Sequence, residues 1–465
     1  MIEEKIVSAL EKIRILKQEK EETGGEKMIK GKLILEGKIE LVSPAMIGCG
    51  RDENSDMDVI RDANGKPYIP ATSFTGVLRH AIKLDNSYKK KLEEFWGTPK
   101  KDNTGHKDLK QSSIIVSDLM PEGNVEVVIR DGVKIDNKKG IAEKGAKFDY
   151  EVIEPGAKFK LNIEVNLNGN EDDFKKQMLA TIINLLKSEK IRIGAKTNSG
   201  FGKIKLVEQS ICEFDFSKKQ DVFRWLKQDF SNPIDFNIEP LRLTQRTFSI
   251  NADFVIKNSL IIRSYNIEPD MPDTEHIKSK GKPVLPGTSL KGAIRARAER
   301  IVNTLQKPET IIKDLFGDVE EEKKTAKKGR ILIEETVLEG YPEEVQTRIK
   351  IDRFTGGTIE SALLETKPLF RGKDEKIFNV RMTINDYKEH EAGLMLLVLK
   401  DLWTGDLPVG GEKAIGRGVL EGRKAIIKWD DREIVFEDPT RLNDSEKQQL
   451  QEFVKALVNN GGATC

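Results

Sequence analysis

The chain has 465 residues, of which 37% are hydrophobic and 33% are charged, and its formal net charge is +1. This length favours two or three domains with their own cores, and the balanced charge argues against nucleic-acid binding through overall positive charge, so that such a partner would need local basic grooves. The three cysteines, Cys49, Cys212 and Cys465, have no CxxC spacing, which argues against a disulfide framework and a structural zinc site and favours a reducing compartment.

Residues 1–29 begin with MIEEKIVSALEKIRILKQEK, an amphipathic pattern that predicts a helical extension. Acidic residues run through this segment, unlike a signal or transit peptide. No apolar run in the chain reaches the length of about 18 residues that a membrane-spanning helix needs. We therefore predict a cytoplasmic protein without a membrane partner.

The next part of the chain has the pattern of a strand, a loop and a helix. KLILEGKIELVS predicts a strand at residues 32–43, and an irregular loop follows at 44–69. IPATSFTGVL at 69–78 then opens a helix, with Thr72 and Ser73 where an N-cap is expected. The apolar stripe behind this start has the spacing of a buried helix face and consists of Phe74, Val77, Leu78 and Ile82.

Further strands and a second helix complete this unit. SSIIVSDL at 112–119 is a short β run, and FKLNIEVNL at 159–167 alternates apolar and polar residues as a half-buried strand does. FKKQMLATIINLLKS at 174–188 predicts the second helix, and KIKLV at 203–207 predicts the closing strand. The order β-α-β-β-α-β is the ferredoxin-like arrangement, which also underlies RNA-recognition folds.

The second half of the chain repeats these landmarks. Pro70 of IPATSFTGVL and Pro286 of LPGTSLKGAI are 216 positions apart, and the same offset separates the KID segments at 134–136 and 350–352. The glycines Gly194, Gly200 and Gly202 match Gly410, Gly416 and Gly418. Solenoid repeats are far shorter, so each copy should have its own core. We predict an α+β fold of two tandem ferredoxin-like domains with insertions.

The expected boundaries follow from these landmarks. They are a helical extension at 1–29, domains at 30–236 and 245–438, a linker at 237–244, and a C-terminal helix and tail at 439–465.

The two helices that begin at the TS motifs are candidates for holding a sugar–phosphate backbone. A helix N-terminus presents free backbone N–H groups, a glycine permits close approach, and basic residues follow one turn apart. The alternative is an ordinary capped helix with exposed basic residues. The candidate RNA contacts are Thr72, Ser73, Gly76, Arg79 and Lys83 in the first copy and Thr288, Ser289, Lys291, Gly292 and Arg295 in the second.

The glycine loops at 192–203 and 410–418 are a second candidate RNA contact. They lack the GK(S/T) ending of a Walker loop and the following helix of a Rossmann fingerprint. A plain connection between strands is the alternative. The basic candidates in these loops are Arg192, Lys196, Lys203 and Arg417.

The loops before the two TS helices are acidic. RDENSDMDVIRD contains Asp52, Glu53, Asp56, Asp58 and Asp62, and NIEPDMPDTEH contains Asp270, Asp273 and Glu275. A carboxylate beside bound RNA can hold a divalent ion or orient the attacking oxygen and the leaving group, whereas a solvated loop is the alternative. The histidines His80, His106, His276 and His390 form no HExxH pair and do not match between copies, which argues against zinc and disfavours a histidine-based ribonuclease.

Taken together, these motifs resemble the RAMP proteins, the ferredoxin-fold RNA-binding proteins of CRISPR–Cas systems. The ordered set of (I/L)P-x-TS helix, FWG or LFG, basic KID segment and glycine loop is most similar to the backbone subunits of type III effector complexes, over about residues 30–208 and 245–430. Two fused copies resemble the tandem backbone subunits of type III-D complexes. The resemblance implies β-hairpin thumbs at about 130–150 and 348–366, which contain Lys134 and Lys350 as further RNA contacts.

The resemblance also implies that one loop aspartate in each domain cleaves target RNA beside the thumb. The family pattern places this residue shortly before a V-I-K/R-D segment and so points to Asp56, with Asp58 as the alternative. The second copy has EHIK instead and Pro272 at the matching offset, so Asp273 is the candidate and Asp270 the alternative. Asp56 and Asp273 are then the candidate ligands of a divalent cation, Mg²⁺ or Mn²⁺.

The leading hypothesis is a guide-RNA-binding backbone subunit of a type III effector complex, an endoribonuclease that cuts complementary target RNA at regular intervals. The alternatives are the same scaffold without cleavage and a nuclease that processes the guide precursor. The expected partners are the CRISPR guide RNA, single-stranded target RNA and other effector subunits.

Overall fold

A computed structural model of the protein describes residues 28–50, 56–98, 111–136, 139–265, 270–320 and 325–459. Most of the predicted N-terminal extension and the end of the predicted tail lie outside the described residues. Asp52, Glu53 and His106 also lie outside them.

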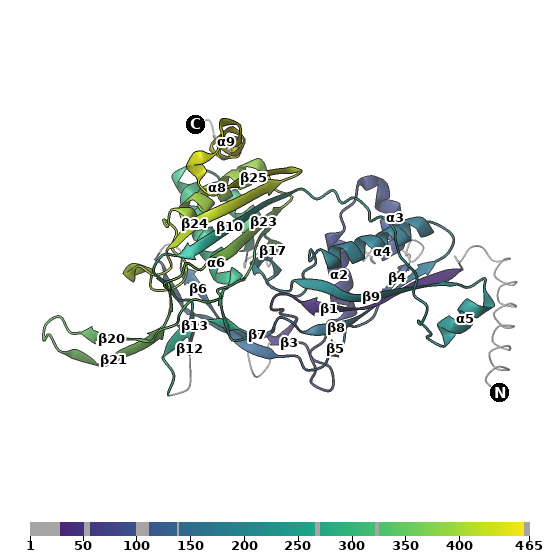
Figure 1. Ribbon diagram of the computed structural model, residues 1–465, viewed down its shortest axis with the longest axis horizontal. Helices are drawn as coiled ribbons and strands as arrows, with labels where there is room; N and C mark the ends of the chain where they lie inside the picture. Colours follow the sequence, from purple (N-terminus) through teal and green to yellow (C-terminus); the bar gives the residue numbers. More distant parts are fainter. Residues whose placement is uncertain are drawn as a thin grey trace.

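The first repeat is built on one antiparallel sheet (Figure 1). Its central strand β1 (Gly31–Leu41) pairs with β8 (Lys158–Leu167) on one side and with β9 (Ile204–Asp215) on the other, and β4 (Ile114–Val116) pairs with the far side of β8. Alternate residues of β1 are buried against helices because strand side chains alternate between the two faces of a sheet. The helices are α2 (Ala71–Ala81), α3 (Lys89–Trp96) and α4 (Asp172–Lys187).

The second repeat has the same arrangement. Its central strand β10 (Thr247–Ile256) lies between β23 (Phe378–Asn385) and β24 (Leu420–Trp429), and β18 (Ile331–Ile333) pairs with β23. Its helices are α6 (Gly287–Thr304), α7 (Thr310–Phe316) and α8 (Glu389–Trp403). In both repeats the sheet order places the second, third, first and fourth core strands side by side, which confirms the predicted ferredoxin-like fold.

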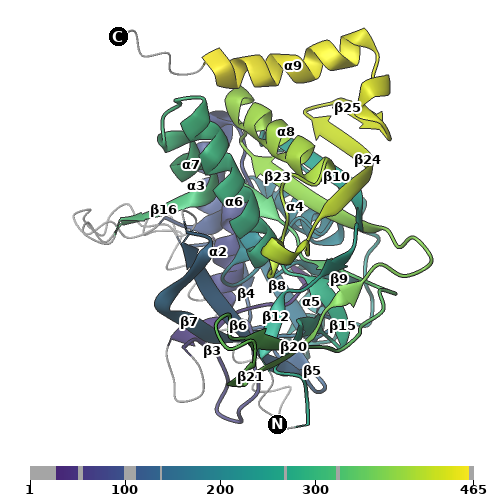
Figure 2. The ribbon, with the colours of Figure 1, turned by 90° about the vertical axis from the view of Figure 1, so that its left-hand side faces the viewer.

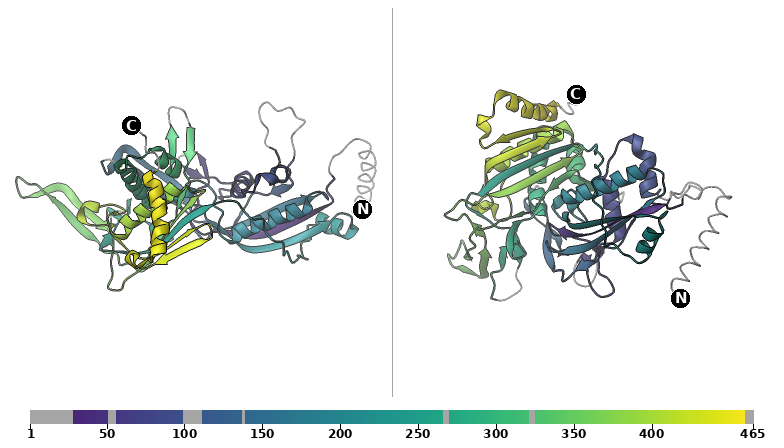
Figure 3. Two further views of the ribbon diagram at one scale, coloured as in Figure 1. Left: turned by 90° about the horizontal axis from the view of Figure 1, so that it is seen from above. Right: turned by 45° about the vertical axis from the view of Figure 1, so that its right-hand side comes forward.

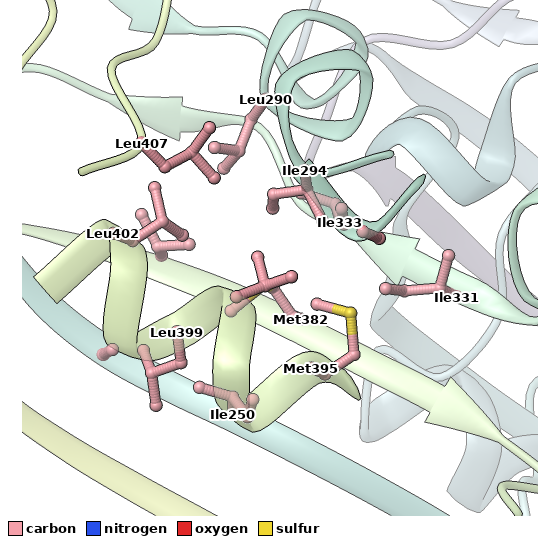
Figure 4. Packing of buried hydrophobic residues seen from close by; sticks show 14 of the residues in the cluster. Ile250, Leu290, Ile294, Ile331, Ile333, Met382, Met395, Leu399, Leu402 and Leu407 are labelled. Atoms are coloured by element: carbon pink, nitrogen blue, oxygen red, sulfur yellow. The ribbon is translucent and has the colours of Figure 1, made fainter. Parts of the chain in front are cut away.

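The core of the second repeat lies between its sheet and the helices α6 and α8. Leu290 and Ile294 of α6 point toward Met395 and Leu402 of α8, and side chains of β10, β18 and β23 complete the cluster (Figure 4). Leu290, Ile294 and Leu402 have no exposed surface. The apolar spacing behind the TS motif therefore marks a core helix, as predicted.

Two C-terminal elements extend the second repeat beyond the ferredoxin-like core. Strand β25 (Arg432–Phe436) pairs with β24 at the sheet edge, and helix α9 (Asp444–Asn459) lies across α8 (Figure 2). Phe453 of α9 makes edge contacts with the rings of Phe248 and Trp429. The predicted C-terminal helix is thus part of this core.

Each repeat also carries a long β-hairpin. Strands β6 (Val127–Asp136) and β7 (Ile141–Ile153) form the first hairpin, and β20 (Gln346–Ile351) and β21 (Thr358–Lys367) form the second. The second hairpin projects away from the rest of the molecule at the end opposite the first repeat (Figure 3). Both hairpins lie where thumbs were predicted.

The two TS helices begin earlier than predicted. Pro70 and Pro286 are the residues that precede the first helical turn, and neither helix has a side-chain cap from its own N-cap residue. The predicted N-caps Thr72 and Ser73 instead lie inside the first turn of α2. The correction has a physical reason, because both prolines are in an extended conformation that ends the preceding segment and leaves the next residue free to start the helix.

The segment between the repeats is attached to the first one. Helix α5 (Lys219–Leu226) is followed by residues without helix or strand up to β10. The Leu241 N–H donates to Thr181 Oγ1 of α4, and the Thr244 N–H donates to the Lys83 carbonyl after α2.

Short strands complete the described structure. They are β2 (Gly48–Gly50), β3 (Asp58–Val59), β5 (Pro121–Glu122), β11 (Ser259–Leu260), β12 (Arg263–Tyr265), β13 (Thr274–His276), β14 (Lys278–Ser279), β15 (Lys282–Leu285), β16 (Gly317–Glu320), β17 (Thr325–Lys328), β19 (Thr336–Val337) and β22 (Leu369–Phe370).

Candidate RNA interface and cleavage sites

The acidic loop of the first repeat lies along the second strand of the first hairpin. The Asp56 N–H donates to Asp149 Oδ1 at 3.0 Å, and the Asp149 N–H donates to Asp56 Oδ2 at 3.4 Å. One step further along, the Glu151 N–H donates to the Met57 carbonyl at 3.0 Å. Asp56 is exposed, so its carboxylate is held at the base of the hairpin within reach of solvent.

The acidic loop of the second repeat makes the matching contact. The Glu365 N–H of β21 donates to Asp273 Oδ2 at 2.8 Å, and β13 continues from there as a short parallel partner of β21. Asp149 and Glu365 are 216 positions apart, which is the offset of the repeat. The hairpins therefore place Asp56 and Asp273 at equivalent positions. The repeat offset leads from Asp56 to Pro272, and the loop accommodates the difference of one residue between Pro272 and Asp273.

The two alternative aspartates are less alike. Asp58 belongs to β3 and is 3% exposed, so bound RNA would not reach it without a change of the loop. Asp270 is exposed and immediately follows residues outside the described range. Of the four candidate aspartates, Asp56 and Asp273 are the pair that shares one structural position.

The residues at the first site suit a hard divalent cation that also binds substrate. Mg²⁺ keeps several waters and is held in proteins by one or two carboxylates together with phosphate oxygens of the substrate. The Asp56 and Asp149 carboxylates are adjacent and can supply this number of ligands. Within the described ranges, no group of three or more His, Cys, Asp or Glu side chains is arranged to hold a metal ion by itself.

The TS helices differ in how open their first turns are. Thr72, Ser73 and Gly76 are exposed on α2, although the Ala71 N–H at its start donates to Asp118 Oδ1 at 2.7 Å. The start of α6 is covered instead, because Gly287 packs against the Ser199 carbonyl of the first glycine loop. Thr288 and Ser289 are accordingly half-buried, and Gly292 is exposed.

The basic residues of these helices also fall into two groups. Arg79 is exposed, whereas Lys83 pairs with Asp386 of the second repeat at 2.5 Å. Arg295 pairs with Glu299 of its own helix at 2.9 Å. Burial, and next the neighbouring Arg295, lower the pKa of Lys291 to about 8, so this lysine lies in a desolvated and cationic environment.

The first glycine loop is part of the contact between the repeats. Arg192 forms an ion pair with Glu334 of the second repeat, and Lys203 lies between Glu189 at 2.8 Å and Glu334 at 3.7 Å. Lys196 lies over the rings of Tyr150 and Phe148 at the hairpin base, and burial lowers its pKa to about 8. Arg192 and Lys203, two of the predicted RNA contacts, are therefore paired with carboxylates of the protein itself.

The second glycine loop carries more positive than negative charge. Glu412 accepts ion pairs from Arg417 at 2.7 Å, Arg263 at 2.9 Å and Arg348 at 3.0 Å. The Arg417 side chain is 3% exposed, and its Nη1 has no hydrogen-bond partner among the described residues. Three guanidinium groups thus surround one carboxylate at the base of the second hairpin. The net positive charge of this cluster favours the binding of an anion.

The predicted lysines of the hairpins are on their surface. Lys134 pairs with Glu143 across the first hairpin at 2.9 Å and is 68% exposed, and Lys350 is exposed on β20. The sequence patterns pointed to Arg417 of the arginine cluster but not to Arg263, Arg348, Asp149 or Glu365. The offset of 216 could have revealed Asp149 and Glu365, because both positions carry an acid.

His276 lies beside the second acidic loop but belongs to the core. It has no exposed surface, its Nδ1 accepts the Ile262 N–H at 3.3 Å, and its Nε2–H donates to the Val284 carbonyl at 2.8 Å. Burial lowers its pKa to about 4. Both nitrogens are therefore used inside the protein.

None of the described helices is long and apolar enough to cross a membrane.

Comparison with known proteins fits two copies of one domain. The family model of the RAMP superfamily matches residues 38–205 and again residues 257–421. The chain is 31% identical over 213 residues to the CRISPR system Cms endoribonuclease Csm3 of Methanocaldococcus jannaschii, an alignment that covers 40% of this chain and 83% of that protein. Two matches that take in most of the chain, each centred on a ferredoxin-like sheet, show that the protein belongs to the RAMP superfamily.

Proposed function

We propose that the chain is a backbone subunit of a type III CRISPR effector complex, which binds the guide RNA and cleaves the paired target RNA at two positions. The superfamily match and the endoribonuclease named among its relatives support the first part of this proposal. The observation that carries the second part is the equivalent placement of Asp56 and Asp273 on the two hairpins. The partners are then the guide RNA, the single-stranded target RNA and the other effector subunits.

In this proposal the hairpins position the aspartates beside the RNA backbone. Each hairpin base fixes an exposed carboxylate through a strand N–H, so the carboxylate oxygens lie in one place before RNA binds. Such a carboxylate can orient the attacking oxygen and the leaving group of the target strand. A divalent cation, Mg²⁺ or Mn²⁺, held at Asp56 and at Asp273 would stabilise the negative charge that develops on the phosphate.

The RNA contacts belong to the same proposal. Exposed Arg79, Lys134 and Lys350, with Thr72, Ser73 and Gly76 at the start of α2, offer donors to phosphates of a single strand. The cluster of Arg263, Arg348 and Arg417 adds an anion-attracting site at the base of the second hairpin. On α6, exposed Gly292 and its half-buried neighbours Lys291 and Arg295 would contact RNA.

The test is assembly of the chain with guide RNA and complementary target RNA, followed by mapping of the cut positions. We expect Asp56→Ala to remove one cut and Asp273→Ala to remove the other, because each aspartate serves the hairpin of its own repeat. Guide affinity should not change, since neither residue is a basic contact. Cleavage that survives both substitutions and EDTA would contradict the nuclease.

A scaffold that binds guide RNA without cutting is the second candidate. It is favoured by the hydrogen bonds that both aspartates accept from hairpin N–H groups. A carboxylate that accepts such a bond can have the structural role of holding the loop on the hairpin and no catalytic role. A wild-type complex that binds target RNA tightly and leaves it intact in Mg²⁺ and in Mn²⁺ would support this candidate.

A further inference from the structure

The two acidic loops are fastened to their hairpins by ion pairs of different design. In the first repeat Glu151 of β7 forms a bidentate ion pair with Arg61. Arg61 Nη1 lies 2.8 Å from Glu151 Oε2, and Arg61 Nη2 lies 2.9 Å from Glu151 Oε1. The same carboxylate accepts the Val59 N–H at 2.9 Å, and Arg61 Nη1 donates to the Val59 carbonyl at 3.0 Å. Both backbone groups of Val59 are thus held by one pair of side chains, which we call the first clamp.

The first clamp is close to the candidate cleavage residue, and its carboxylate is buried while the Arg61 side chain is 33% exposed. Val59 follows Asp56 by three positions in the loop. Glu151 follows Asp149, the hairpin residue that contacts Asp56, by two positions. The Glu151 residue is 7% exposed, and the Arg61 guanidinium holds the pKa of its carboxyl below the usual range. A charged and bidentate pair between a planar guanidinium and a carboxylate prefers one geometry, so it holds the loop at a defined distance from the hairpin.

The second repeat cannot use the same pair. Position 367, which corresponds to Glu151, is a lysine, and the loop lysine Lys278 lies near it. Their charges are joined by Glu343, whose Oε2 lies 3.1 Å from Lys367 Nζ and 3.0 Å from Lys278 Nζ. Lys278 also pairs with Glu275 of the loop at 3.2 Å. Glu343, which precedes the hairpin, is therefore the centre of the second clamp.

We propose that Glu151 and Glu343 are positioning residues, each of which holds the cleavage aspartate of its own repeat in register with its hairpin. This inference rests on the proposed function and adds to it that the two cuts are controlled by separate ion pairs. Neither glutamate touches the reacting atoms in this scheme. Loss of a clamp lets its loop move on the hairpin, and a displacement of about 1 Å can slow a reaction by roughly a hundredfold.

The experiment uses the assembled complex with guide and target RNA and measures the rate of each cut separately. Glu151→Ala should slow the cut that Asp56→Ala removes by roughly tenfold to a hundredfold and leave the other cut unchanged. Glu343→Ala should do the reverse. Glu151→Gln, which keeps an oxygen for the Val59 N–H and loses the charge that Arg61 needs, should fall between wild type and Glu151→Ala.

Matched controls lie in the same hairpins. Glu143 is on β7 with Glu151 but pairs with exposed Lys134, and Glu360 is exposed on β21, so Glu143→Ala and Glu360→Ala should leave both rates unchanged. The unaffected cut within each variant shows that the chain is folded and bound to RNA. A purely structural role would instead slow both cuts together or lower target affinity.

The outcomes separate the two proposals. Wild-type complex without two aspartate-dependent cuts overturns the proposed function and the clamps with it. If the wild-type complex makes two such cuts, either of two results overturns the clamps alone. One is that both cuts keep their wild-type rates in Glu151→Ala and Glu343→Ala. The other is that the rates of both cuts fall together in Glu151→Gln.

Discussion

The environment of His276 makes stability depend on pH. Its folded-state pKa of about 4 lies below the value of about 6.5 for an unfolded chain, so the unfolded state binds more protons between these values. The stabilising contribution of the neutral ring is complete above about pH 6.5 and is lost as the pH falls toward 4.

Urea unfolding at two pH values measures this effect. Between pH 7 and pH 5 the free energy of unfolding should fall by about 2 kcal/mol because of His276. A His276→Gln variant should be less stable at pH 7 and lose this part of the pH dependence. His80 is exposed on α2, so His80→Gln should keep the wild-type profile, and an unchanged profile in His276→Gln would refute the assignment.

At the scale of elements, two helical glycines have opposite surroundings. Gly393 of α8 packs directly against the Phe453 carbonyl of α9, whereas nothing lies within 4 Å of the place that a methyl group would occupy at Gly292 of α6. Close approach of α8 and α9 therefore depends on the missing side chain at Gly393.

Alanine at each position gives a matched pair. Gly393→Ala should destabilise the second repeat by about 1–3 kcal/mol because the added methyl group separates α9 from α8. Gly292→Ala should be neutral or stabilise by up to about 1 kcal/mol through helix propensity. Thermal unfolding compares the two, and hydrogen exchange should show loss of protection in α9 with Gly393→Ala alone. Equal effects of both substitutions would contradict this packing.

At the scale of the whole molecule, buried charges join the two repeats. Arg130 of the first hairpin lies 2.7 Å from Glu335 of the second repeat and 3.2 Å from Glu154 of the first, and its side chain is 3% exposed. Glu154 in turn accepts the Ser279 hydroxyl at 2.5 Å and the Lys280 N–H at 2.9 Å. The repeats therefore share one polar network, which joins the first hairpin to the second repeat.

Removal of one partner should be costly. Glu335→Ala leaves the buried Arg130 short of a counter-charge and should destabilise the chain by about 3 kcal/mol. Glu339→Ala is the control, because its pair with Lys282 is exposed and screened by water and should contribute little to stability. Thermal unfolding of both variants checks the difference. A Glu335→Ala midpoint no lower than that of Glu339→Ala would mean that the network does not hold the repeats together.

The sequence by itself determined the order of elements and the duplication, whereas the places of the hairpins were predicted from the resemblance to RAMP proteins. FKLNIEVNL became β8 because its alternation of apolar and polar residues already separates a core face from an exposed face. LPGTSLKGAI became the start of α6 for a similar local reason, since its apolar spacing matches one side of a helix. Such patterns act over a few neighbouring residues and need no knowledge of the rest of the chain.

Only the tertiary structure decided which partners the charged residues have. Arg192 and Glu334 are 142 positions apart, and Asp273 meets the hairpin 92 positions away. Whether a basic side chain faces solvent or a carboxylate depends on the segment that folds beside it, and local spacing does not contain that information. The first glycine loop therefore joins the repeats, while the acidic loops, which differ most between the copies in sequence, reach equivalent positions on the two hairpins.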